Sequence, residues 1–99
     1  MSENLSARLE VHNDTQRPRV VWVEPVAEDF TLLSGESLEI VARGIQNRQW
    51  FGLVELEDAT QVYLQEPDFM DFQVFQNGKR LERGHNRDAG RKAGIRSLL

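Results

Sequence analysis

Apolar and polar residues alternate in short runs along most of the chain, and turn-forming residues separate the runs. Leu38, Ile40 and Ala42, for example, fall on one face of such a run. A period of two residues is typical of β-strands that bury one face. The pattern predicts strands near residues 9–11, 19–24, 30–33, 37–43, 49–56, 60–64, 71–76 and 79–81.

The turns between these runs indicate how the strands are arranged. Asn77-Gly78 is the strongest hairpin signal, because both central residues of a type I′ turn need positive φ. Seven or eight short strands at this spacing are typical of a β-sandwich or a small barrel. We therefore predict an all-β fold, a single small antiparallel β-sandwich over residues 6–82. A basic, flexible C-terminal tail is expected over residues 83–99.

The alternation also predicts the core. Five residues in alternating strands are expected to be buried: Leu38, Ile40, Val54, Val62 and Val74. The run 49–56 begins with apolar residues at both odd and even positions, so part of it is expected to be covered on both faces.

The residue types that the sequence lacks exclude several kinds of catalytic and metal site. The 99 residues contain no cysteine and two histidines, which excludes disulfides, cysteine-based zinc sites and thiol nucleophiles. No serine lies in a Gly-x-Ser-x-Gly elbow, and no glycine-rich phosphate loop is present. We therefore expect no enzymatic activity, no cofactor and no metal site. Without a signal-peptide pattern or a long apolar run, we expect a cytoplasmic protein that does not bind membranes.

The net charge of −4 is unevenly distributed. Residues 1–78 carry five basic and fourteen acidic side chains, whereas residues 79–99 carry seven basic and two acidic ones. The basic tail has three interpretations: it binds a polyanion, folds back on the acidic body, or keeps the protein soluble. Nucleic acid is the partner we expect least, because the tail has no aromatic residue for base stacking and the acidic body repels phosphates.

Three turns gather acidic side chains that can offer oxygen ligands to a cation. They are Glu24 with Glu28 and Asp29, Glu55 with Glu57 and Asp58, and Glu66 with Asp68 and Asp71. None matches a calcium-loop motif. Binding of a small ligand or divalent ion at such loops is the alternative function.

Aromatic side chains provide the candidate binding residues. Strict alternation cannot place every ring inside, and exposed rings beside arginines are common at binding surfaces. Arg48, Trp50 and Phe51 form the best local candidate. Trp22 and Glu24, near the end of the 19–24 strand, are further candidate binding residues.

Several of these segments, taken together, resemble a group of small uncharacterised bacterial proteins. The resemblance lies in Val11-His12-Asn13-Asp14-Thr15, Trp22-Val23-Glu24-Pro25, Asp29-Phe30-Thr31-Leu32 and Ser34–Val41. That group carries an Asn-x-Thr turn, a Trp-x-Glu-Pro strand exit and a Pro-Gly-Glu turn, and Ser34 stands here in place of the proline. The resemblance covers roughly residues 9–82 and implies a compact β-sandwich with no known activity.

The function expected from these observations is that of a small interaction module. It would dock a protein partner through one sheet face or one end of loops. Only Arg19 and Pro25 would protect the 19–24 strand if it lay at a sheet edge, so a monomer and a weak edge-paired dimer both stay open.

Overall fold

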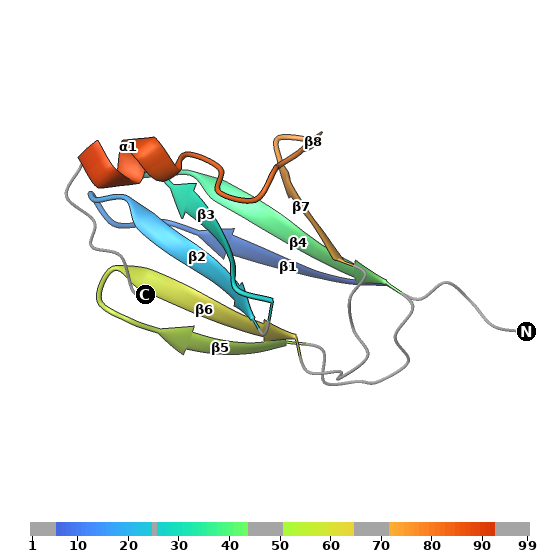
Figure 1. Ribbon diagram of the computed structural model, residues 1–99. Helices are drawn as coiled ribbons and strands as arrows, with labels where there is room; N and C mark the ends of the chain where they lie inside the picture. The colour runs from blue at the N-terminus through green and yellow to red at the C-terminus, as the bar shows by residue number, and fades with distance from the viewer. Residues whose placement is uncertain (1–5, 25, 44–50, 65–71, 93–99) are drawn as a thin grey trace, which may run out of the picture.

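The computed structural model describes residues 6–24, 26–43, 51–64 and 72–92, and within these ranges it contains eight strands and one short helix (Figure 1). No helix in the described ranges is long and apolar enough to cross a membrane. The elements are β1 (Ser6–His12), β2 (Arg19–Glu24), β3 (Glu28–Leu32), β4 (Ser37–Arg43), β5 (Phe51–Glu55), β6 (Ala59–Leu64), β7 (Phe72–Gln76), β8 (Lys79–Arg80) and α1 (Arg87–Lys92).

The strands form two four-stranded sheets, which confirms the predicted sandwich-like all-β fold. Sheet A has the order β1-β4-β7-β8, and sheet B has the order β3-β2-β6-β5. Every described pair is antiparallel except β2 with β6, which is parallel. A parallel pair needs a long connection, and the chain provides one by passing through β4 of sheet A between β3 and β5. The β2–β6 pair therefore differs from the wholly antiparallel prediction.

The core lies between the inner faces of the two sheets. Four of the five predicted core residues, Leu38, Ile40, Val62 and Val74, are buried there. The prediction for Val54 is wrong, because this side chain is exposed. Val54 pairs with Gln61, which alternates with the core residues of β6 and so faces outward. The apolar residues on both faces of this run had concealed its register.

The 19–24 strand is not at a sheet edge, where it could have paired with a second molecule. The 19–24 strand, β2, is a central strand, because β3 and β6 pair with its two sides. It is therefore unavailable for edge-to-edge pairing. The outermost described strands are β1 and β8 in sheet A, and β3 and β5 in sheet B.

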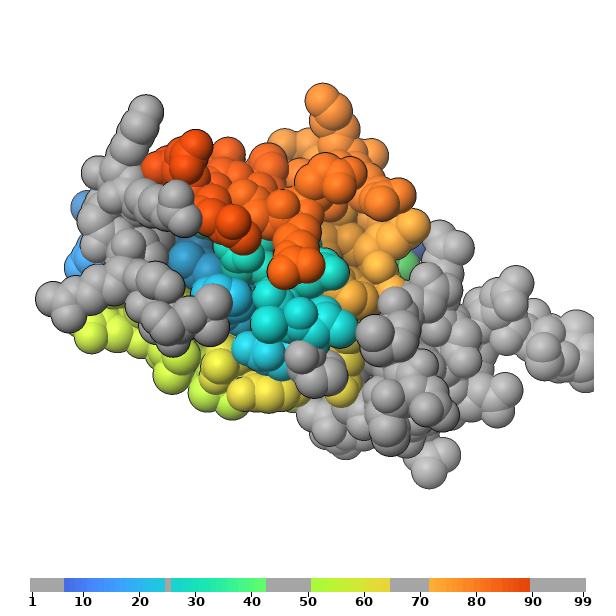
Figure 2. All heavy atoms as spheres, viewed as in Figure 1, coloured from blue at the N-terminus to red at the C-terminus, as the bar shows by residue number. Residues whose placement is uncertain are grey.

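The chain after β8 covers the free edge of β3. The Thr31 N–H donates to the His85 carbonyl at 2.8 Å, and the Gly84 N–H donates to the Asp29 carbonyl at 2.7 Å. Figure 2 shows this red and orange segment lying over the cyan β3, and α1 packs against the same strand. Residues 84–92 of the expected tail thus lie against β3 and include α1, and residues 93–99 lie outside the described residues.

A two-bond ion pair holds this segment in place. Arg87 Nε and Nη2 donate to the two carboxylate oxygens of Asp29 at 3.0 and 2.6 Å. These hydrogen bonds, with the attraction of the Asp29 charge, raise the pKa of Arg87 above its ordinary value. This contact is the folding back on the acidic body that the charge distribution offered as one interpretation.

Replacing Arg87 with alanine should release the segment without unfolding the sandwich. We expect the Thr31 and Gly84 amides to exchange hydrogen several-fold faster, because they bond across this junction. The Ile40 and Val62 amides should keep their protection. Arg83→Ala removes a charge from an exposed position of the same segment and is the matched control. Equal effects of the two variants would show that charge alone, and not the Asp29 contact, holds the segment.

Candidate functional site

The described members of the predicted binding group do not form one site. Phe51 opens β5, half-buried, and packs against the core. Trp22 lies on the opposite, outer face of sheet B, beside Asp29 and Gln61, and Glu24 follows on the same face. The Trp22 ring is buried, and its Nε1 has no hydrogen-bond partner among the described residues. Arg48 and Trp50 lie outside the described residues.

Exposed large apolar side chains gather instead at β5. Among the described residues they are Leu53, Val54, Leu56 and Tyr63, with exposed fractions of 52%, 41%, 39% and 38%. Two lie in β5, one follows it, and Tyr63 lies in the neighbouring β6. We call these four residues the β5 edge surface. The sequence signal for it was the apolar character of both faces of the run, which had been interpreted as burial on both sides.

One side of the β5 backbone has no partner strand among the described residues. The Leu56 N–H donates to the Ala59 carbonyl at 2.7 Å. Leu56 and Ala59 are therefore a hydrogen-bonded pair at the turn between β5 and β6. Bonded and non-bonded pairs alternate along an antiparallel ladder. Gly52 and Val54 therefore turn their N–H and C=O groups toward β6, whereas those of Phe51, Leu53 and Glu55 point away from it. No described strand pairs with that outward side.

Arg19 anchors the end of this edge. From β2, its largely buried guanidinium donates to the backbone carbonyls of Leu56 at 2.9 Å and Ala59 at 2.7 Å. It also binds the Glu55 carboxylate at 2.9 Å, which accepts a further hydrogen bond from the Thr60 hydroxyl at 2.8 Å. The acidic side chain of β5 is thus compensated within the chain, and these contacts join the end of the β5 edge to β2.

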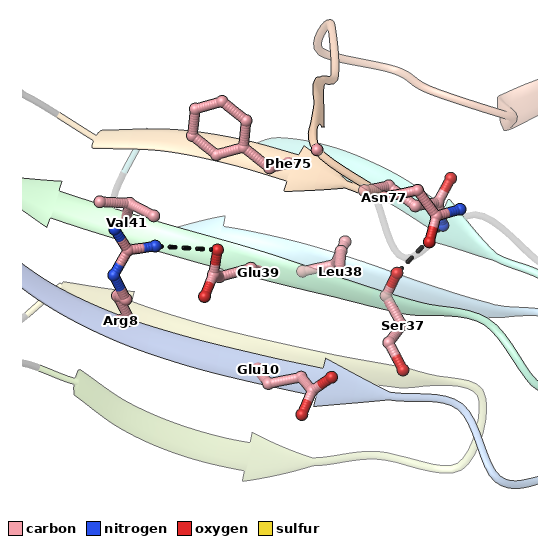
Figure 3. A pocket seen from close by; sticks show the side chains of 10 residues that line it. Arg8, Glu10, Ser37, Leu38, Glu39, Val41, Phe75 and Asn77 are labelled. Atoms are coloured by element: carbon pink, nitrogen blue, oxygen red, sulfur yellow. Dashed lines mark hydrogen bonds and ion pairs between the residues drawn. The ribbon is translucent and has the colours of Figure 1, made fainter.

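The outer face of sheet A carries a second, polar feature, an open groove of about 570 Å³ (Figure 3). Among the residues that line it, Arg8 binds Glu39 at 3.1 Å, and Val41 and Phe75 supply apolar side chains. His12 Nδ1 lies 2.6 Å from the Ser37 hydroxyl at the end of the same face. Within the described residues no carboxylate is hydrogen-bonded to this histidine, so this part of the chain shows no third group of a hydrolytic triad beside the pair.

The two acidic turns that the structure describes each place at least one carboxylate against an arginine. Arg87 binds Asp29, Arg19 binds Glu55, and Arg17 lies 3.6 Å from the carboxylate of Asp58. The described part of the chain holds no group of three or more His, Asp or Glu side chains suited to a metal ion. The third cluster, Glu66 with Asp68 and Asp71, lies outside the described residues.

Comparisons of the chain with protein-family models, with curated proteins and with solved structures give no match. The resemblance described from the sequence therefore stays a prediction. The functional argument depends on the chain's own geometry, in which the β5 edge surface is the most distinctive exposed feature.

Proposed function

We propose that the protein is a non-enzymatic interaction module that binds a protein partner at the β5 edge surface. An extended segment of the partner would add to sheet B as a further strand beside β5. The observation that carries this proposal is that a strand edge with no partner among the described strands coincides with exposed apolar side chains. In strand addition, backbone hydrogen bonds supply affinity and alternate side chains supply specificity.

The other outermost strands support the proposal by contrast, because each is protected against pairing. Residues 84 and 85 bond to β3. Strand β8 has two residues, Lys79 and Arg80, both exposed, and β1 carries the exposed Glu10 on its outer face. Short strands, charges and covering segments are the usual means of blocking an edge. In β5 the one charged residue, Glu55, is held by Arg19.

The alternative of a ligand or ion bound by acidic loops has less support. In two of the three clusters the structure directs carboxylates to arginines within the chain, so binding a cation there would first require breaking those pairs.

Photo-crosslinking in the native cells tests the proposed surface. A benzophenone side chain placed at position 56 of the full chain should give a discrete crosslinked product, and the same side chain at position 10, on β1, should give none. Adding Leu53→Lys to the position-56 chain should lower the yield about tenfold or more, because a buried apolar contact would become a charged one. Thermal unfolding should stay unchanged, since Leu53 is exposed.

The position-10 chain serves as the control for non-specific capture, because Glu10 is exposed on the other sheet. Equal products at the two positions, no product at either, or a yield insensitive to Leu53→Lys would each overturn the proposal.

A further inference from the structure

We propose that the segment occupying the β5 edge is the β5 strand of a second copy of this chain. The two strands would run antiparallel about a two-fold axis at Leu53, so that two copies of sheet B become one eight-stranded sheet. This inference rests on the proposed function and names the partner for the same surface.

The backbone register supports a two-fold axis at Leu53. The three β5 residues with outward N–H and C=O groups, Phe51, Leu53 and Glu55, are spaced symmetrically about Leu53. An antiparallel copy centred there places Phe51 opposite Glu55 of the other copy and Leu53 opposite itself. Each of these is a position at which both residues direct their backbone groups across the interface. All outward groups of β5 are then satisfied at once.

The side chains are self-complementary in the same register. On the inner side the two Leu53 side chains meet, and both are half exposed in the single chain. On the outer side Val54 lies opposite Gly52, which has no side chain and pairs on its other side with Tyr63 of β6. Val54 of one copy can therefore lie over Gly52 of the other and approach Tyr63. Three of the four residues of the β5 edge surface are thereby covered.

Charge is also compatible with this register. Glu55 faces Phe51 of the second copy rather than another carboxylate, and Arg19 compensates its charge from within the chain. A two-fold axis moved to Glu55 would instead place the two carboxylates opposite each other, which is unfavourable. An interface of one strand per copy is small, so the dimer should be weak, with a Kd in the range of about 10 μM to 1 mM.

Sedimentation equilibrium of the full chain tests the inference. The mean mass should rise from 11.4 kDa at low concentration toward twice that value at about 1 mM. Leu53→Lys and Leu53→Glu should each remain monomeric, because the axis places like charges together. An equimolar mixture of these two variants should associate at least about tenfold more tightly than either alone. This rescue is specific to a register in which position 53 meets itself.

A proline substitution provides a second test of the backbone contacts. Leu53→Pro removes an outward N–H and leaves the bonds to β6 intact, so it should abolish dimerisation while circular dichroism shows the same fold. A wild-type chain that stays monomeric at about 1 mM would overturn the inference, as would dimers that survive Leu53→Lys or a mixture that gains nothing. If the position-56 crosslink then joins a different protein, strand addition stands and the second copy does not. If no crosslink forms, both proposals fail.

Discussion

Replacing Ile40 with alanine should lower the free energy of unfolding by about 2–5 kcal/mol, the range for truncating a buried isoleucine. Ile40 is fully buried in the centre of sheet A, where it pairs with Leu9 on one side and Val74 on the other. Two costs add to this loss of stability. The variant loses the free energy gained by burying three carbon atoms, and it leaves a cavity that the flanking strands do not fill. Urea denaturation measures it as a shift of the midpoint at constant m value.

Val54→Ala is the matched control for this prediction. It also shortens a β-branched aliphatic residue in a strand, but at an exposed position. We expect a change within about 0.5 kcal/mol, as for surface substitutions in general. A loss at Val54 as large as that at Ile40 would contradict the outward orientation of Val54 and with it the register of β5.

Replacing Asn13 with aspartate should cost about 2–4 kcal/mol, although it exchanges only an NH₂ group for an oxygen. Asn13 is buried, and its Nδ2 donates to the carbonyls of Arg17 at 2.8 Å and Leu32 at 3.0 Å. Its Oδ1 accepts from the N–H and the hydroxyl of Thr15. In Asn13→Asp both donated bonds are lost, and a buried carboxylate faces two carbonyl oxygens.

The neighbouring substitution Asp14→Asn makes the reverse chemical change at an exposed position. It should alter the urea midpoint little, so the difference between the two variants isolates the hydrogen bonds of Asn13. If Asn13→Asp were as stable as the wild type, the side chain would have to be hydrated rather than buried among carbonyls.

Asn13 shows what the sequence could and could not predict about the fold. The pattern Asn13-x-Thr15 indicated a turn, and the turn bonds to Thr15 are local. The bond to Leu32 joins residues 19 apart, so nothing in the local sequence indicated that Asn13 is buried and links the turn after β1 to the end of β3. The Asn77-Gly78 hairpin was predictable for the opposite reason: both residues adopt positive φ, at 53° and 79°, and the turn type alone requires this.

The candidate site was less predictable than the core. Leu38 lies between the polar residues Ser37 and Glu39, and this alternation indicates the face on which Leu38 and Ile40 are buried. Leu53 and Val54 are both apolar, and local sequence cannot distinguish a strand covered on both faces from an edge strand exposed on both. The order of strands decides between them, and that order depends on pairings between distant segments. The parallel β2–β6 pair and the bond between Arg87 and Asp29 also join distant segments, so they could not be predicted from local sequence either.

The segment that covers β3 has a consequence for protein synthesis. Arg87 follows Asp29 by 58 residues, so the ribosome completes β3 long before its cover exists. During that interval β3 presents an open row of amide and carbonyl groups to neighbouring nascent chains and to chaperones. Sheet B also depends on a distant segment, because β2 pairs with β6, which ends at Leu64. Pairings this distant along the chain form slowly, and the protein therefore assembles sheet B only after most of the described chain has been made.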